Sequence, residues 1–266
     1  MRRNKAQFLI IVALTLSIVL ISITLLTYKT TTTINVPSTN TEWYLTLNIE
    51  QDFPRALALA LAKATSSSSA TNETASSTAS DELDVWKQAF IAAYAIEDVT
   101  LNIKSNAGLT FSLGHDRNVG ITDKVSGSTI TKSYHIPDLT FSDYVFLRWK
   151  SPEAISAISA SIRVNCKLSG LYGWNYTTLV FLNATVISIS KSGSEYNVTL
   201  LVTNERGPIE GLGLDNFEVL GIPTLYLYVF GGGKYILSFS TSAVTVDIKV
   251  IDDRGICVYI KDVELS

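Results

Sequence analysis

The stretch 244-VTVDIKVIDDRGICVYI-260 decides how the end of this chain folds. Over residues 244–250, apolar residues alternate with polar ones, and a period of two is typical of a strand with one buried face. Residues 252–255 are turn formers, and residues 256–260 again favour a strand. The stretch therefore predicts an antiparallel β-hairpin.

Residues 181–243, upstream of the hairpin, repeat the strand pattern at short intervals and show no helix signal. Further strands are predicted at 196–203, 217–220, 225–230 and 235–239, with turns at 221–223 and 231–233. In the first of these, the alternation places Tyr196 and Val198 on one face and Asn197 on the solvent side. Residues 181–266 therefore predict an antiparallel β-sandwich.

Two motifs in this region resemble those of immunoglobulin-like modules in microbial surface proteins. Residues 202-VTNERGPIEGL-212 place a Gly-Pro-hydrophobic turn after a strand, and residues 233-GKYILS-238 open a later strand with Gly-x-Tyr. The resemblance implies an immunoglobulin-like β-sandwich with an adhesive or spacing role and without catalysis.

Residues 42–180 mix helix and strand signals, which predicts an α/β domain and makes the whole chain α+β. The expected helices are 52–64, 81–96 and 152–164, and the expected strands are 43–49, 100–103, 109–113 and 144–147. Residues 65–80 consist almost entirely of Ser, Thr and Ala, so a mobile loop is expected there.

The N-terminal residues 1–28 predict a short cytoplasmic tip and a membrane-spanning helix. Residues 8–26 contain only apolar residues, Ser and Thr, and as a helix they would span roughly 28 Å, close to the thickness of a bilayer core. Arg2, Arg3 and Lys5 precede this run, so the positive-inside rule places the N-terminus in the cytoplasm. Residues 29–41 then form a stalk, and residues 30–266 are extracellular.

The residues Lys5-Ala6-Gln7-Phe8 resemble the class III signal peptides of archaeal type IV pilin-like proteins. That resemblance implies cleavage between Ala6 and Gln7, with the apolar helix retained on the mature protein. Two alternatives remain, a plain signal anchor and a leader that is removed. All three export the rest of the chain.

Export makes two kinds of modification relevant. Asn-x-Ser/Thr sequons stand at Asn72, Asn175, Asn183 and Asn197, which are candidate glycosylation sites or chance triplets. The two cysteines, Cys166 and Cys257, either form a disulfide or remain two buried thiols.

The charge pattern excludes nucleic acid as a partner. The net charge is −3, and basic residues do not cluster outside the extreme N-terminus. The only histidines are His115 and His135, and no serine lies in a Gly-x-Ser-x-Gly elbow. We therefore expect no catalytic residues, cofactor or metal site, although a structural calcium at Asp252-Asp253 is an alternative to simple turn chemistry.

Together these patterns predict a single-pass membrane protein, archaeal in style, with residues 42–180 and 181–266 as two extracellular domains. Its expected role is structural, adhesive or filament-associated, with the lipid bilayer and other envelope or filament proteins as partners. The alternative is a membrane-tethered hydrolase or solute-binding protein.

Overall fold

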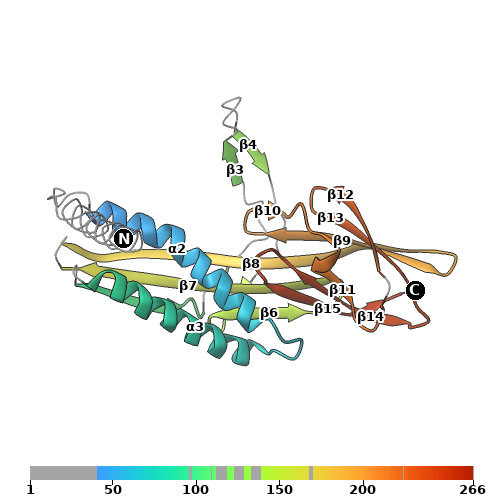
Figure 1. Ribbon diagram of the computed structural model, residues 1–266, viewed down its shortest axis with the longest axis horizontal. Coiled ribbons are helices and arrows are strands. Elements are labelled where there is room, and N and C mark those ends of the chain that lie inside the picture. The colour runs from blue at the N-terminus through green and yellow to red at the C-terminus, as the bar shows by residue number, and fades with distance from the viewer. Residues whose placement is uncertain are drawn as a thin grey trace, which may run out of the picture. The chain divides into compact units, whose positions relative to one another are not determined.

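The computed structural model describes residues 41–95, 98–108, 110–111, 119–122, 129–132, 139–167, 170–223 and 225–265 (Figure 1). The predicted membrane helix at 8–26, the possible cleavage site at Ala6 and Gln7 and nearly all of the stalk lie outside these residues. The chain divides into two compact units, Met1–Leu47 and Asn48–Ser266, and the packing described below is that of the second. Neither described helix is long and apolar enough to cross a membrane.

The second unit is α+β, as predicted, with two helices on an antiparallel sheet and a separate three-stranded sheet. The main sheet has eight strands in the order β1-β7-β8-β9-β13-β12, with β6 paired to β7 and β10 to β9. The small sheet has the order β11-β14-β15, and β2-β5 and β3-β4 form two short pairs. The elements are α2 (Thr41–Ala64), α3 (Asn72–Ala93), β1 (Val99–Ser105), β2 (Thr110–Phe111), β3 (Val119–Thr122), β4 (Thr129–Lys132), β5 (Leu139–Thr140), β6 (Val145–Trp149), β7 (Glu153–Cys166), β8 (Leu171–Ser192), β9 (Glu195–Asn204), β10 (Gly207–Pro208), β11 (Phe217–Val219), β12 (Tyr226–Gly231), β13 (Lys234–Ser240), β14 (Thr245–Ile251) and β15 (Cys257–Glu264).

The C-terminal strands confirm the alternation that predicted them. The strands β9, β11, β12 and β13 match the predicted ranges to within a few residues, and β14 and β15 form the expected hairpin. Tyr196 and Val198 are buried in β9, whereas Asn197 is half-buried on the opposite face.

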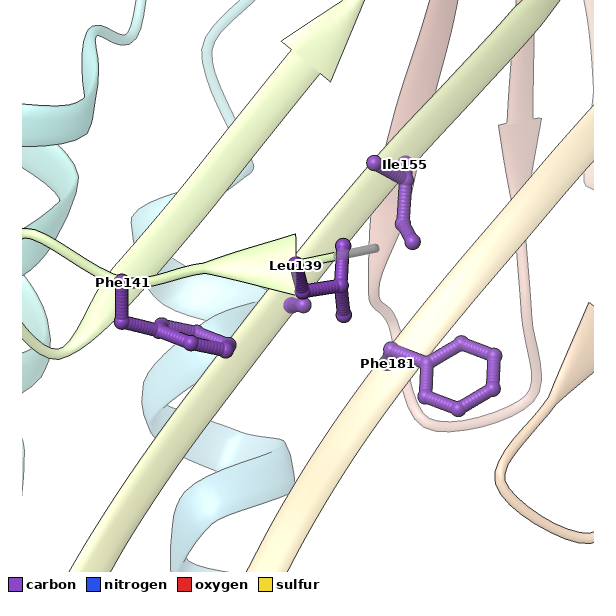
Figure 2. Packing of buried hydrophobic residues seen from close by; sticks show 5 residues of the cluster. Leu139, Phe141, Ile155 and Phe181 are labelled. Carbon is purple, nitrogen blue, oxygen red and sulfur yellow. The ribbon is translucent and has the colours of Figure 1, made fainter. Parts of the chain in front are cut away.

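The expected helix at 152–164 is wrong, because these residues form the central strand β7. Residues 154–160 are all buried, since both faces of β7 are covered there, so the alternation that marks a half-exposed strand is lost. Ile158 and Ile162 lie on one face, and Ile155 lies on the other with Phe181 and Leu139 (Figure 2).

The expected strand at 43–49 is also wrong, because α2 already begins at Thr41 and contains Pro54 in its interior. Ile49, Phe53 and Leu57 are buried at spacings of four, the period of a helix. The short alternation from Trp43 onward therefore gave a misleading strand signal.

The predicted mobile loop at 65–80 is corrected to a short connection followed by helix. The helix α3 begins at Asn72, where Thr71 and Thr74 form a reciprocal capping box. Ala75, Ser76 and Ala79 are buried, and the Ser76 hydroxyl accepts a hydrogen bond from the Val145 amide at 3.1 Å. Small side chains thus let α3 lie close to β6, where the sequence composition suggested an unpacked loop.

The connection itself is fastened to the small sheet. The Cys257 amide donates to the Thr65 hydroxyl at 3.1 Å, and the Lys261 ammonium donates to the Ser68 carbonyl at 3.0 Å. These two bonds hold the connection to β15 at its start and in its middle.

The core of the main sheet lies on both of its faces. On one face, Phe53 of α2 contacts Trp86 of α3 and Tyr176 of β8, with ring centroids 5.5 and 6.4 Å apart. Further along the same sheet, Phe217 of β11 contacts Tyr235 of β13 at 4.9 Å. On the opposite face, Leu139 and its neighbours form the cluster of Figure 2.

The predicted domain boundary at 180/181 falls inside β8, which continues across it without interruption. The strand β8 pairs with β7 over 171–185 and with β9 over 182–192. The sheet is therefore stepped, because different parts of β8 have different neighbours.

Candidate functional site

The step leaves part of β8 as an open edge. β7 pairs with β8 from Leu171 onward, but the first residue of β8 to pair with β9 is Leu182, opposite Asn204. Within the described ranges, no strand pairs with residues 171–181 on the β9 side. We call residues 171–181 the open edge. An edge of this kind presents unpaired backbone amides and carbonyls.

Two side chains close the end of the open edge at Phe181. The Phe181 amide donates to Glu205 Oε2 at 3.3 Å, and the Phe181 carbonyl accepts from Arg254 Nη2 at 3.0 Å. In a continuous sheet both groups would bond to the next strand, but β9 ends one residue before Glu205. A carboxylate and a guanidinium therefore replace the missing backbone acceptor and donor.

A charged network holds these two side chains in place. Arg254 forms ion pairs with Glu205 and with Asp252, the latter at 2.7 Å. The Asp252 side chain is 3% exposed, and its Oδ1 accepts hydrogen bonds from the Arg254 and Ile256 amides, each at 3.0 Å. Asp252 thus serves the hairpin turn and orients Arg254 toward Phe181. The described residues contain no group of three or more His, Cys, Asp or Glu side chains placed to hold a metal ion.

The geometry of an antiparallel ladder decides which way the backbone amides and carbonyls of the other open-edge residues point. Hydrogen bonds from successive residues of a strand alternate between its two neighbours. Asn175, Thr177 and Leu179 therefore direct their backbone groups to the same open side as Phe181. The alternation agrees with Thr178, whose carbonyl accepts from the Ser159 hydroxyl of β7 at 3.2 Å.

A cleft lies beside Phe181, at the end of the open edge that Glu205 and Arg254 cap. It has a volume of about 430 Å³ and lies between Arg55, Ala58 and Leu59 of α2, the turn at 204–209 and the turn at 252–254. A second hollow of about 280 Å³ continues along α2 past Pro54 to Glu50 and shares Arg55 and Arg254 with the first. Glu205 and Arg254, which bond the backbone of Phe181, line both hollows.

The side chains of the open edge are uncharged. Residues 168–181 contain no Asp, Glu, Lys, Arg or His. Tyr172 is 68% exposed, and the rings of Trp174 and Tyr176 stack with centroids 5.9 Å apart. Backbone donors and acceptors beside neutral aromatic and hydroxyl side chains suit an extended peptide segment.

The predicted glycosylation residues lie in different environments. Asn72 begins α3, Asn175 is exposed on the open edge and Asn197 is half-buried on β9. Asn183 is 4% exposed, its Nδ2 donates to Glu153 Oε1 at 3.4 Å, and its Oδ1 has no hydrogen-bond partner among the described residues. A glycan on Asn183 therefore does not fit the folded sheet, whereas Asn72 and Asn175 are accessible.

The structure does not bring the two cysteines of the possible disulfide together within the chain. The Ser156 hydroxyl donates to the Cys257 carbonyl at 2.7 Å, so Cys257 lies beside Ser156 of β7. Cys166 is ten residues further along the same strand, which corresponds to roughly 33 Å. A disulfide requires Cα atoms within about 7 Å. Both cysteines are buried, and burial raises the pKa of the Cys257 thiol.

His115 and His135, on which a hydrolase interpretation depends, lie outside the described residues. No family model, curated protein or solved structure matches the chain.

The sequence did not predict the open edge, because it depends on where β9 ends relative to β8. The uncharged run 168–181 was the available signal. That run is equally typical of a strand with neighbours on both sides.

Proposed function

We propose that this chain is a membrane-anchored protein of the cell surface that holds an extended segment of another envelope or filament protein along the open edge of β8. The observation that carries the proposal is the open edge itself, an uncharged strand segment whose outward backbone groups pair with no described strand and which ends at the Glu205–Arg254 pair. Strand addition of this kind derives its affinity from backbone hydrogen bonds. The role is structural or adhesive and does not require catalysis.

The sequence supports the proposed location of the chain at the cell surface. The apolar run 8–26 with preceding Arg2 and Arg3 indicates an anchor with its N-terminus in the cytoplasm, which leaves residues 30–266 outside. The accessible sequons Asn72 and Asn175, together with Asn197, are then available to glycosylation. Cleavage between Ala6 and Gln7 would leave the same helix on the mature chain.

Contacts between the two surface-protein motifs support an immunoglobulin-like module in the C-terminal part. The Tyr235 hydroxyl donates to the Ile209 carbonyl at 2.8 Å and accepts from the Leu212 amide at 3.2 Å. A Cβ atom at Gly233 would lie 2.6 Å from the Val202 carbonyl oxygen and 2.8 Å from Pro208 Cβ. Each motif therefore requires residues of the other, which is what one shared structural module implies.

Photocrosslinking in native membranes tests the strand-binding proposal. We place benzoylphenylalanine at Tyr172, beside the open edge, and combine it with Leu179→Pro or Leu179→Ala. Proline removes only the outward-directed amide, so the ladder to β7 survives, and both variants remove the same leucine side chain. We expect the crosslinked partner in the alanine variant and its loss in the proline variant. Equal crosslinking in both variants would refute strand addition at this edge.

The anchor is tested separately by mass spectrometry of the native protein. A chain that begins at Met1 indicates an uncleaved anchor, and one that begins at Gln7 indicates pilin-like processing. Recovery of the whole chain as a soluble cytosolic species without glycans would refute the proposed location, whatever the crosslinking shows.

A further inference from the structure

The strand β12 forms the last strand of the main sheet and carries large exposed side chains. Tyr226, Tyr228, Val229 and Phe230 are each more than half exposed. No strand in the described part of the chain pairs with the outer side of β12. Natural sheets usually protect such edges with charged residues, with proline or with very short strands. Residues 219–233 contain no charged residue, and the one proline, Pro223, precedes the strand.

The side chains of β12 form a symmetric series. Residues 226–230 read Tyr-Leu-Tyr-Val-Phe, which is aromatic, aliphatic, aromatic, aliphatic, aromatic. The series is therefore the same from either end, with Tyr228 at its centre. When such a strand pairs antiparallel with a copy of itself, each aromatic residue meets an aromatic residue and each aliphatic residue meets an aliphatic one.

We propose that β12 is an interface with a second copy of this chain, in an antiparallel strand pair centred on Tyr228. In this register Tyr226 of one copy faces Phe230 of the other, Leu227 faces Val229, and the two Tyr228 side chains are direct neighbours. Cross-strand aromatic pairs stabilise antiparallel sheets. A two-fold axis through the centre makes the contact closed, so it forms a dimer and does not continue into a fibre.

Charge favours a second copy over a charged partner. Like charges that face each other across a strand pair destabilise it, and an antiparallel strand that pairs with itself places the same residue of both copies side by side at its centre. β12 has no charge to repel its copy, and no charge with which to attract a charged segment. The matching partner is a neutral strand in which aromatic and aliphatic residues alternate in the same way, and β12 itself is such a strand.

The bulge at the end of β12 limits the length of the pair. The register with β13 shifts between Val229 and Gly231, so Phe230 is displaced and is 68% exposed. A single short strand pair buries less than the roughly 1,200 Å² of a stable interface. The dimer is therefore weak in dilute solution and forms where chains are concentrated in the plane of a membrane. This concentration depends on the proposed membrane anchor.

Cysteine crosslinking of the full chain in lipid vesicles tests the register. The single variants are Tyr226→Cys, Tyr228→Cys and Phe230→Cys, with Val85→Cys on α3 as an exposed control at 63% exposure. Both native cysteines are buried. In the proposed register, two Tyr226 positions are offset by four residues, about 13 Å, beyond disulfide reach.

We expect Tyr228→Cys to form a disulfide-linked dimer on oxidation at a rate on the order of tenfold above the other three variants. Mixed vesicles of Tyr226→Cys and Phe230→Cys should give the heterodimer. Flotation of the vesicles reports membrane incorporation separately, so failure of the anchor is distinguishable from failure of the interface. If the chain is incorporated and dimers are absent, or form equally at all four positions, the proposal is wrong.

Discussion

Replacing Arg254 with methionine tests whether the side-chain cap on β8 contributes to stability. Methionine keeps much of the length of the side chain and removes the guanidinium. The variant loses the ion pairs with Glu205 and Asp252 and the hydrogen bond to the Phe181 carbonyl at 3.0 Å. Asp252, whose side chain is 3% exposed, then remains buried with backbone donors alone.

The expected cost is about 2 to 3 kcal/mol of unfolding free energy. Removing one partner of a buried ion pair costs about 3 to 5 kcal/mol. The Arg254 and Glu205 side chains are 26% and 21% exposed, so water can reach part of the network and lowers that figure. The Phe181 carbonyl adds little, because water at the open edge can replace the lost donor.

Urea unfolding of the full chain in mild detergent, followed by tryptophan fluorescence, measures this cost. The matched control is Arg55→Met on α2, because the Arg55 side chain is 79% exposed and pairs with Asp52 at 3.3 Å. An exposed pair one turn apart contributes less than about 0.5 kcal/mol. We expect the urea midpoint to fall clearly for Arg254→Met and hardly at all for Arg55→Met.

A double-mutant cycle with Glu205→Gln isolates the pair itself. We expect a coupling of about 1 to 2 kcal/mol between Arg254 and Glu205, since the two side chains share one network. If Arg254→Met costs no more than Arg55→Met, or if the cycle shows no coupling, then the cap does not stabilise the end of the open edge.

Three further predictions concern other sites and use simple measurements. Tyr235→Phe loses the hydrogen bonds to the Ile209 carbonyl and from the Leu212 amide, and should cost about 1 to 2 kcal/mol in the same urea assay. Because burial raises the pKa of Tyr235, the unmodified protein should also lose stability as pH rises above about 10, and the Phe variant should lose less. Cys257 is 5% exposed with a raised thiol pKa, so iodoacetamide at pH of about 8 should label it only after unfolding, and native labelling detected by mass spectrometry would contradict its burial. Gly233→Ala should destabilise by more than about 2 kcal/mol, since its Cβ meets backbone atoms at a φ of +74°. Gly193→Ala, at φ +64° with no atom within 4 Å, should cost only about 1 kcal/mol, and equal costs would refute the contact argument.

The sequence predicted β9 and β14 most clearly, because each of these two strands buries one face, whereas β12 is exposed along nearly its whole length. In β9 and β14 the buried residues alternate with less buried ones, so the pattern can be read directly. The α+β class was predicted from the mixture of helix and strand signals in residues 42–180. The strand β7 was not predictable in this way, because residues 154–160 are covered on both sides by parts of the chain that are distant in sequence.

The helices illustrate a second limit of prediction from the sequence. The Ser/Thr-rich residues 72–80 form a helix because Ala75, Ser76 and Ala79 pack closely on a neighbouring strand, and composition alone cannot show that neighbour. The open edge could not be predicted from the sequence for the same reason. It depends on the pairing partner of each residue of β8, and in particular on the end of β9 at Asn204. The charged cap at Phe181 joins residues far apart in the sequence, so no local pattern contains it.

The strand β8 has a mechanical consequence. At about 3.3 Å per residue, its 22 residues extend for roughly 73 Å as one covalent element. A pulling force applied along β8 loads its many hydrogen bonds to β7 and β9 in shear, so they must break together and not one after another. The parts of the sheet that contain β7 and β9 share this strand. A load carried along β8 would therefore be resisted by both parts of the sheet at once.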